Sequence, residues 1–195
     1  MITPEATDGP SVRRGPSAPR PYASADAAGI LAVDLACAEV GEGMVLDRDQ
    51  VQQDLGEIDR RSLASGLQQV LVVEVGSDVA GYASARKLFP ARVRHVCVAA
   101  VAVHPRFQGQ GVGRALMQAV VAWADAAGVS RLELYVRSDN GRAIALYESV
   151  GFVLEGVRRG FVRTLRGELI DDFIMVRFAP ELNGARPQGE PSPAS

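Results

Sequence analysis

The spacing of apolar residues changes several times along the chain, and three stretches have the spacing of helices. The first follows the potential capping residues Ser24 and Asp26 and continues toward Val40. The second can begin at Asp47 or Asp49. The third is a stripe with a spacing of about four that ends at a glycine, which predicts a surface helix. Its residues are Val112, Leu116, Val120, Trp123 and the terminal Gly128.

Other stretches are dominated by β-branched and apolar residues, which predict strands. Residues 70–75 and 79–87 flank a Gly-Ser-Asp turn sequence and therefore predict a hairpin. Residues 93–103 (VRHVCVAAVAV) are too β-branched for a helix and too continuous for a half-exposed strand, which indicates a central, buried strand. The remaining expected elements are strands at 131–137, 152–157 and 169–178 and a short helix at 140–150.

The order of these elements predicts one α/β domain. Two helices are followed by a hairpin, a strand, a helix, a strand, a helix and a final hairpin. This order is typical of a mixed sheet with helices on its faces, an α/β or α+β architecture. Residues 1–21 and 181–195 are rich in Pro, Gly and Ser and have no apolar period, so we expect a disordered leader and tail around a folded domain at 22–180.

Composition and charge narrow the classes of function. The chain has 195 residues, of which 47% are hydrophobic and 23% charged, a balance typical of a globular domain. The formal net charge of −2 gives no general attraction to a polyanion and disfavours nucleic-acid binding. No stretch resembles a signal peptide or approaches the roughly 20 apolar residues needed to span a bilayer. The expected compartment is therefore the cytoplasm, with no membrane partner.

The two cysteines do not predict a metal or redox site. Cys37 and Cys97 lie in apolar runs and have no CxxC spacing. We interpret both as small buried hydrophobic residues. No metal ligand set is expected.

A glycine-rich segment at residues 108–114 (QGQGVGR) carries the strongest chemical signal. Glycines between a buried strand and a helix let the backbone approach an anion, and the free N–H groups of the first helical turn point at it. A flexible turn is the alternative. A P-loop is excluded because Arg114-Ala115 follows Gly113. A dinucleotide fingerprint is excluded because Arg114 or Leu116 stands where its last glycine is needed.

Two motifs resemble the GNAT superfamily of N-acetyltransferases. The first is Gln108-x-x-Gly111-x-Gly113, with Val-Ala-Val-His-Pro before it and Arg-Ala-Leu after it. The second is NGRAIALYESVGF, in which Asn140 and Tyr147 are seven positions apart. The resemblance covers residues 70–178, and its closing part looks most like the branch that acetylates free amino acids and similar small amines.

The resemblance implies a twisted, mostly antiparallel sheet with splayed central strands and helices on both faces. It also implies an acyltransferase with acetyl-CoA as acyl donor, whose pantetheine arm pairs with the central strand and whose pyrophosphate lies on the glycine-rich segment. A backbone N–H near the end of that strand would polarise the thioester carbonyl. The implied cofactor-binding residues are Val101, Ala102, Val103, Gln108, Gly109, Gln110, Gly111, Val112, Gly113, Arg114, Asn140, Ala143 and Tyr147.

The resemblance also implies catalytic residues. Tyr147 matches the family's proton donor to the departing thiolate, and Asn140 would hydrogen-bond the cofactor arm or an active-site water. Family members carry the base on the central strand or in a Leu-Glu-Val triplet on the next one. Here the central strand has no carboxylate, and Tyr135 stands at the triplet's glutamate. Glu133, two positions earlier on the same face, is the candidate base.

The acceptor is expected to be an α-amine. Such a group is about a tenth neutral at pH 7, whereas a lysine side chain is neutral only about once in two thousand molecules. A free amino acid or similar small molecule is predicted; a protein N-terminus and a non-catalytic acetyl-CoA-binding module are the alternatives. Arg158, Arg159 and Arg163 are candidate partners for a substrate carboxylate, against the alternative of surface arginines. A homodimer is left open.

Overall fold

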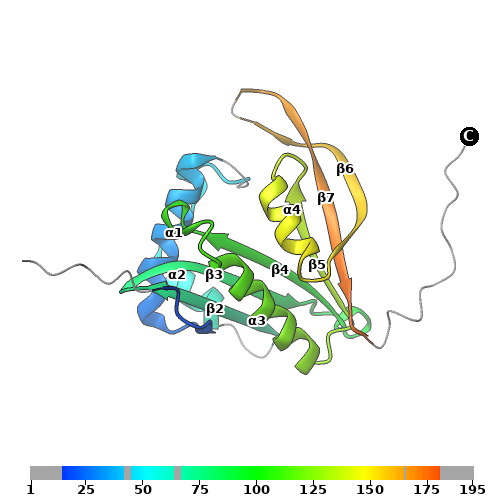
Figure 1. The fold of residues 1–195 in the computed structure, drawn as a ribbon, viewed down its shortest axis with the longest axis horizontal. Coiled ribbons are helices and arrows are strands. Elements are labelled where there is room, and N and C mark those ends of the chain that lie inside the picture. Colours follow the sequence, from blue (N-terminus) through cyan, green and yellow to red (C-terminus); the bar gives the residue numbers. More distant parts are fainter. Residues whose placement is uncertain (1–14, 42–44, 64–66, 165, 181–195) are drawn as a thin grey trace, which may run out of the picture.

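The computed structural model describes residues 15–41, 45–63, 67–164 and 166–180. In this part of the chain, seven strands form one mixed sheet in the order β1-β2-β3-β4-β5-β7-β6, with helices on both faces (Figure 1). The predicted fold class is confirmed. The strands are β1 Arg20–Pro21, β2 Gln68–Val75, β3 Asp78–Lys87, β4 Val96–Val103, β5 Arg131–Arg137, β6 Val153–Arg163 and β7 Leu169–Phe178. The helices are α1 Ala27–Val40, α2 Leu55–Leu63, α3 Val112–Ala126 and α4 Gly141–Glu148. None of them is long and apolar enough to cross a bilayer.

The predicted strands are confirmed, with shifts of one or two residues at several boundaries and larger shifts at two. β5 has the predicted bounds, and β2 and β3 form the predicted hairpin. β4 begins at Val96 rather than at residue 93, because residues 91–93 form a 3-10 turn. β6 continues beyond residue 157 to Arg163, because β7 pairs with it as far as that residue.

The second helix begins later than predicted. α2 starts at Leu55, and the start expected at residue 47 or 49 is wrong. The cap is Asp54, whose carboxylate accepts hydrogen bonds from the backbone N–H groups of Gly56 and Glu57 at 2.8 and 3.3 Å.

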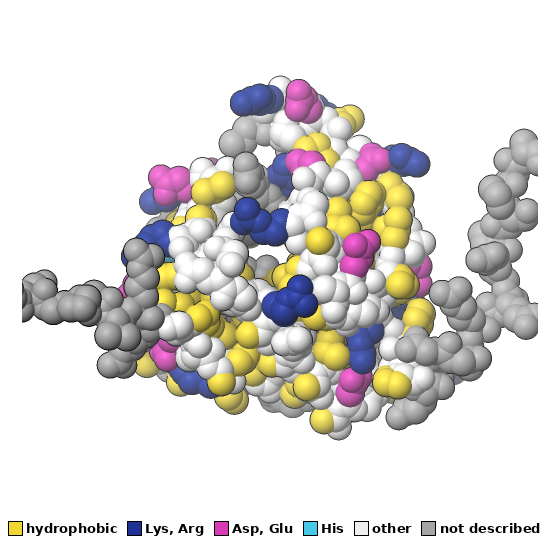
Figure 2. All heavy atoms as spheres, in the orientation of Figure 1, with side chains coloured by type: hydrophobic (Ala, Val, Ile, Leu, Met, Phe, Trp, Pro, Cys, Tyr) yellow, Lys and Arg dark blue, Asp and Glu magenta, His cyan; other side chains and the backbone are white. Residues whose placement is uncertain are grey.

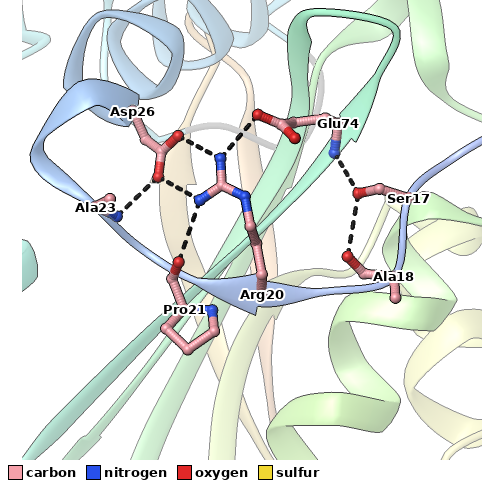
Figure 3. A network of polar contacts seen from close by, with 7 residues as sticks. All are labelled: Ser17, Ala18, Arg20, Pro21, Ala23, Asp26 and Glu74. Atoms are coloured by element: carbon pink, nitrogen blue, oxygen red, sulfur yellow. Dashed lines mark hydrogen bonds and ion pairs between the residues drawn. The ribbon is translucent and has the colours of Figure 1, made fainter.

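A charged cluster joins β1 to the sheet and to the start of α1 (Figure 3). The Arg20 guanidinium donates to both carboxylate oxygens of Asp26, at 2.8 and 2.7 Å, and to Glu74 on β2 at 2.8 Å. Asp26 also accepts a hydrogen bond from the Ala23 N–H at 2.8 Å. It therefore anchors the chain before α1 and makes no side-chain cap to that helix, contrary to the prediction.

The folded body extends toward the amino end of the chain. β1 pairs with β2, and Ser17 hydrogen-bonds the backbone of Glu74. Residues 17–21, assigned to the leader from the sequence, are therefore part of the fold. The rest of the predicted leader, residues 1–14, and the predicted tail, residues 181–195, lie outside the described residues.

Two apolar clusters lie on opposite sides of the sheet. On one side, α3 and α4 pack against side chains of β2 to β5 and β7, with Leu116 and Leu134 almost fully buried. On the other side, Ile30 of α1 and Ile58 of α2 pack against Val72 of β2. Tyr147 lies on the side covered by α3 and α4, whereas Glu133 lies on the side covered by α1 and α2.

The central strands β4 and β5 separate along their length. They are parallel and pair through Val96–Arg131, Cys97–Leu132 and Val98–Glu133. β4 then continues in antiparallel pairing with β3, and β5 with β7. The splayed central strands expected from the family resemblance are thus confirmed.

Candidate active site

The open edge of β4 presents a row of backbone groups toward β5. The His104 N–H donates to the carbonyl of Ala80 in β3 at 2.9 Å, and bonding alternates along an antiparallel ladder. Ala102 therefore directs its backbone groups to β3. Val101 and Val103 direct theirs to the opposite side, where pairing with β5 has already ended. An extended ligand could pair with these two residues as an added strand.

The glycine-rich segment leads from β4 into an uncapped helix. Gly109 and Gly111 have φ angles of 76° and 86°, a left-handed conformation that side chains with a Cβ rarely adopt. Gly111 is the N-cap residue of α3, and no side chain in the described ranges caps that helix. The first-turn N–H groups of Val112, Gly113 and Arg114 therefore have no intrahelical partner and can bind an anion.

Close packing and side-chain bonds shape this segment. A Cβ on Gly113 would lie 3.2 Å from Leu146 Cδ2 and 3.5 Å from Val103 Cγ2, so glycine lets α4 and β4 approach the first turn of α3. Gln110 holds the turn by donating its side-chain amide to the Arg106 carbonyl at 3.0 Å.

Gln108 links the elements that meet at this segment. Its amide donates to the Val103 carbonyl at 3.2 Å and accepts a hydrogen bond from Arg142 of α4. Arg142 and Arg114 are exposed, and neither forms an ion pair with a described residue. Figure 2 shows basic side chains near the centre of the face that carries α3 and α4. Free N–H groups and positive charge thus occur together, a combination suited to a diphosphate.

Tyr147 lies on α4 with its ring in the apolar cluster. It is 6% exposed, and its ring centroid is 6.0 Å from that of Phe152. Burial raises the pKa of its hydroxyl to about 12. No described group hydrogen-bonds this hydroxyl, yet no fully buried side-chain polar atom in the described ranges lacks a partner. The oxygen must therefore reach the protein surface, where it is a protonated donor open to a ligand.

Asn140 caps the helix that carries Tyr147. Its side-chain oxygen accepts a hydrogen bond from the Ala143 N–H at 3.1 Å. The seven-residue spacing therefore places the cap before the first turn and the tyrosine in the last turn of one short helix. The cap leaves the side-chain N–H groups of Asn140 available as donors.

Glu133 points to the other side of the sheet. Its neighbours on β5, Leu132 and Leu134, lie in the α3–α4 cluster, and side chains alternate along a strand. One carboxylate oxygen accepts from Arg131 at 3.1 Å and the other from the Tyr135 hydroxyl at 2.9 Å. The structure therefore does not bring Glu133 together with Tyr147, and both of its oxygens already have partners.

The candidate arginines for a substrate carboxylate also have partners. Arg158 pairs with the buried carboxylate of Asp172, and its guanidinium lies over the rings of Tyr135 and Phe161, at 4.4 and 3.7 Å from their centroids. Arg159 pairs with Asp171 of β7, and Arg163 donates to the Gly167 carbonyl in the turn between β6 and β7. Arg158 and Arg159 are therefore matched by carboxylates, whereas Arg163 bonds a neutral carbonyl and has no carboxylate partner among the described residues.

Cys37 lies closer to the open strand edge than the sequence indicates. Its thiol donates to the Val103 carbonyl at 3.4 Å, and burial raises its pKa to about 11. Cys97 is fully buried as predicted. Helical spacing places Asp34 one turn before Cys37, but spacing alone does not say which strand this face of the helix covers.

Comparisons with known proteins agree with this geometry. The sequence model of the Acetyltransferase (GNAT) family matches residues 41–152. A ribosomal protein bS18-alanine N-acetyltransferase of Escherichia coli is 45% identical over 67 residues, which are 34% of this chain and 45% of the relative. The L-amino acid N-acetyltransferase AaaT of Escherichia coli is 33% identical over 113 residues, 57% of this chain and 68% of the relative.

A solved structure matches over a larger part of the chain. The crystal structure of a GNAT-family acetyltransferase from Streptococcus pneumoniae has a TM-score of 0.77 at 26% identity, covering 82% of this chain and 98% of that one. The chain spans about half the length of the bS18-alanine acetyltransferase that it matches. The family match covers more than half of the chain and includes both the β4–α3 junction and α4, so the chain belongs to the GNAT family of acetyltransferases.

Proposed function

We propose that the protein moves an acetyl group from acetyl-CoA to the α-amino group of an amino acid or a similar small amine. The observation that carries the proposal is the β4–α3 junction, where an open strand edge leads directly into an uncapped helix N-terminus. The pantetheine arm has amides that need partners in a row, and the diphosphate needs N–H donors at its end. The junction offers both in that order along the chain.

The residues of the junction have separate tasks in binding. Val101 holds the arm through its backbone groups and Val103 through its N–H, because Gln108 and Cys37 already occupy the Val103 carbonyl. The N–H groups of residues 109–114 hold the diphosphate. Arg142 adds positive charge from α4. When bound, acetyl-CoA supplies a thioester that an amine can attack. The Val103 N–H polarises the carbonyl at that point, a contribution of a few kcal/mol.

Tyr147 stabilises the leaving sulfur. A thiol of the cysteine type has a pKa of about 8.5, so a hydroxyl with a pKa of about 12 keeps its proton until the sulfur carries negative charge. The tyrosine then donates a hydrogen bond or a proton to that sulfur. Asn140 assists by donating its free side-chain N–H groups to the arm or to a water molecule.

The choice of an α-amine rests on chemistry and on the relatives. An α-amine needs little help to become neutral at pH 7. The two relatives from Escherichia coli described above are named for acceptors that carry such an amine. One name gives L-amino acids, and the other gives the alanine of a ribosomal protein. The second name supports a protein N-terminus as the alternative acceptor.

Thiol release from acetyl-CoA tests the proposal. The acceptors are L-alanine, L-alaninamide, a peptide beginning with alanine and, as a control, the same peptide with a blocked amine. We expect turnover with the unblocked amines, and a kcat/KM for the free amino acid at least tenfold above that for the peptide. The reverse order would favour the N-terminal acetyltransferase. Coenzyme A binding without turnover on any acceptor would favour a binding module. Equal rates with L-alanine and its amide would exclude an arginine partner for the carboxylate.

A further inference from the structure

The second half of α1 crosses the strands that form the candidate active site. Asp34 accepts a hydrogen bond from Tyr82 of β3 at 2.7 Å, and one turn later Cys37 donates to Val103 of β4 at 3.4 Å. After the helix ends, the carbonyl of Gly41 accepts from Arg137 of β5 at 2.9 Å. These contacts run in order from β3 to β5. α1 therefore covers the ends of the splayed strands on the side opposite Tyr147.

Asp34 is the nearest carboxylate to the open edge of β4 along this helix. Side chains three positions apart on a helix are neighbours, with about 5–6 Å between Cβ atoms. Asp34 is thus next to Cys37, whose sulfur touches the Val103 carbonyl. The negative charge of Asp34 contributes to the raised pKa of Cys37, as expected for groups this close. With the thioester at Val103, as proposed above, Asp34 is one helical turn from a residue that contacts this point.

No cation of the described residues pairs with Asp34. Among the described residues, the side chain of Asp34 is bonded by the neutral Tyr82 hydroxyl, and burial raises the pKa of Asp34 itself. Two carboxylates of the neighbouring strands on this side of the sheet are matched by arginines: Glu133 of β5 by Arg131 and Asp172 of β7 by Arg158. A partly buried carboxylate without a counter-charge is costly, and binding a cation there removes this cost.

We propose that Asp34 receives the ammonium group of the acceptor and takes its proton. This inference rests on the proposed acetyl transfer and identifies the proton acceptor for that reaction. It assigns the role to Asp34 rather than to Glu133, whose two oxygens are already bonded to Arg131 and Tyr135. The acceptor class is a primary amine that is protonated in solution.

The protons and bonds of this step balance. Asp34 takes one proton from the ammonium, and the neutral amine attacks the thioester carbonyl carbon. A carbon–nitrogen bond forms, the carbon–sulfur bond breaks, and the sulfur receives a proton from Tyr147. The tyrosine recovers a proton from the nitrogen of the new amide, and Asp34 releases its own to solvent. The products are the N-acetylated amine, the free thiol and one proton.

Asp34→Asn is the test variant, because its amide oxygen can still accept from Tyr82 while the charge is gone. With L-alaninamide as acceptor, we expect kcat/KM to fall about a hundredfold or more at pH 7. The KM for acetyl-CoA and the affinity for coenzyme A should change by less than about twofold. Glu39→Gln removes the same charge from the exposed side of α1 and should leave kcat/KM within about twofold of the parent.

A neutral amine separates proton removal from a structural role. Methoxyamine is uncharged at pH 7, so Asp34→Asn should lower its kcat/KM less than about fivefold. Tyr82→Phe removes the hydrogen bond but keeps the carboxylate, and should lower turnover of L-alaninamide far less than Asp34→Asn does. Thermal unfolding of each variant establishes that it is folded.

Three outcomes would overturn the inference. One is an equal loss with L-alaninamide and methoxyamine. Another is an equal loss in Tyr82→Phe and Asp34→Asn, which would indicate a structural hydrogen bond. The third is a loss in Glu133→Gln with Asp34→Asn active, which would assign the proton to Glu133. Failure of the proposed function is distinct from all three, because the parent itself would then show no turnover.

Discussion

At the scale of single residues, Tyr147 combines two properties that rarely occur together. Its ring is buried beside Phe152, and no residue in the described part of the chain hydrogen-bonds its hydroxyl. A buried hydroxyl normally finds a hydrogen bond within the protein, because leaving it unpaired is costly. The structure instead directs this one to the surface, and burial keeps it protonated through a pKa of about 12.

Removal of the Tyr147 hydroxyl should therefore affect chemistry and leave binding intact. For Tyr147→Phe we expect turnover to fall about a hundredfold, because the leaving sulfur loses its donor, with little change in coenzyme A affinity. Steady-state kinetics and a coenzyme A titration measure the two effects. Tyr22→Phe, which removes a hydroxyl bonded to Asp59 on the other side of the sheet, is the matched control. Unchanged turnover in Tyr147→Phe would exclude it as the acid.

The sequence predicted which helix carries Asn140 and Tyr147, but it did not predict the contacts that Glu133 and Asp34 make. Tyr147 and Asn140 are found on one short helix because their spacing is local. The engagement of Glu133 by Arg131 and Tyr135 on the same strand was not expected, and neither was the place of Asp34. Contacts between a helix and a distant strand depend on how the elements pack, which local spacing does not describe.

At the scale of elements, the glycine-rich segment depends on backbone conformation at the start of α3. Gly111 is left-handed at this start, and Gly128, just beyond the other end of the helix, is left-handed too, with a φ of 67°. A Cβ at either position would meet no atom within 4 Å, so the cost of a side chain is conformational rather than steric crowding by neighbours.

Because Gly111 and Gly128 share this left-handed conformation, they provide a matched pair of variants. Gly111→Ala and Gly128→Ala should each cost about 1 kcal/mol of unfolding free energy, since both force alanine into a left-handed conformation. Only Gly111→Ala should weaken coenzyme A binding, by about tenfold, because it displaces the N–H groups of the first turn. Urea unfolding and calorimetric titration measure the two quantities. Equal coenzyme A affinities in the two variants would contradict the assignment of the diphosphate site.

Element boundaries show where local sequence was ambiguous. The second helix was expected to start at Asp47 or Asp49, and Asp54, which follows them, is of the same capping type but was not among the predicted starts. Asp54 is the residue that caps the helix. A helix that begins there has Ile58 in the buried cluster against β2. Packing of the helix therefore decided among caps that were equivalent in the sequence.

At the scale of the whole molecule, short segments far apart in the chain hold the sheet together at its edge. β1 is two residues long, yet its Arg20 joins Asp26 before α1 to Glu74 on β2. Asp26 is only 5% exposed, so its carboxylate needs this cation. The contact with Arg20 lowers the pKa of Asp26 below its usual value.

Loss of Arg20 should destabilise the fold in a pH-dependent way. For Arg20→Met we expect a loss of about 1–3 kcal/mol at pH 7. The folded-state pKa of Asp26 is depressed, so its stabilisation is present above about pH 4, its unfolded value, and is lost as the pH falls through the depressed pKa. Urea unfolding of parent and variant between pH 7 and pH 3 should show the gap narrowing at the acidic end.

Arg159 supplies the control for this prediction. Its side chain is 83% exposed and pairs with Asp171 at the surface, so Arg159→Met should change stability by no more than about 0.5 kcal/mol. A gap for Arg20→Met that is equally small, or that widens as the pH falls, would contradict the role assigned to the cluster.

The sequence by itself determined most of the elements and the family, and it predicted an anion site at the glycine-rich segment, because each depends on residues close together in the chain. Periodicity predicts helices and strands, and glycines followed by a helix predict an anion site. The tertiary structure alone decided that Tyr147 and Glu133 lie on opposite sides of the sheet. It alone also showed that α1 carries toward β3 and β4 a carboxylate with no cationic partner among the described residues. These features arise from packing between distant segments, whose energies depend on the arrangement of the whole sheet.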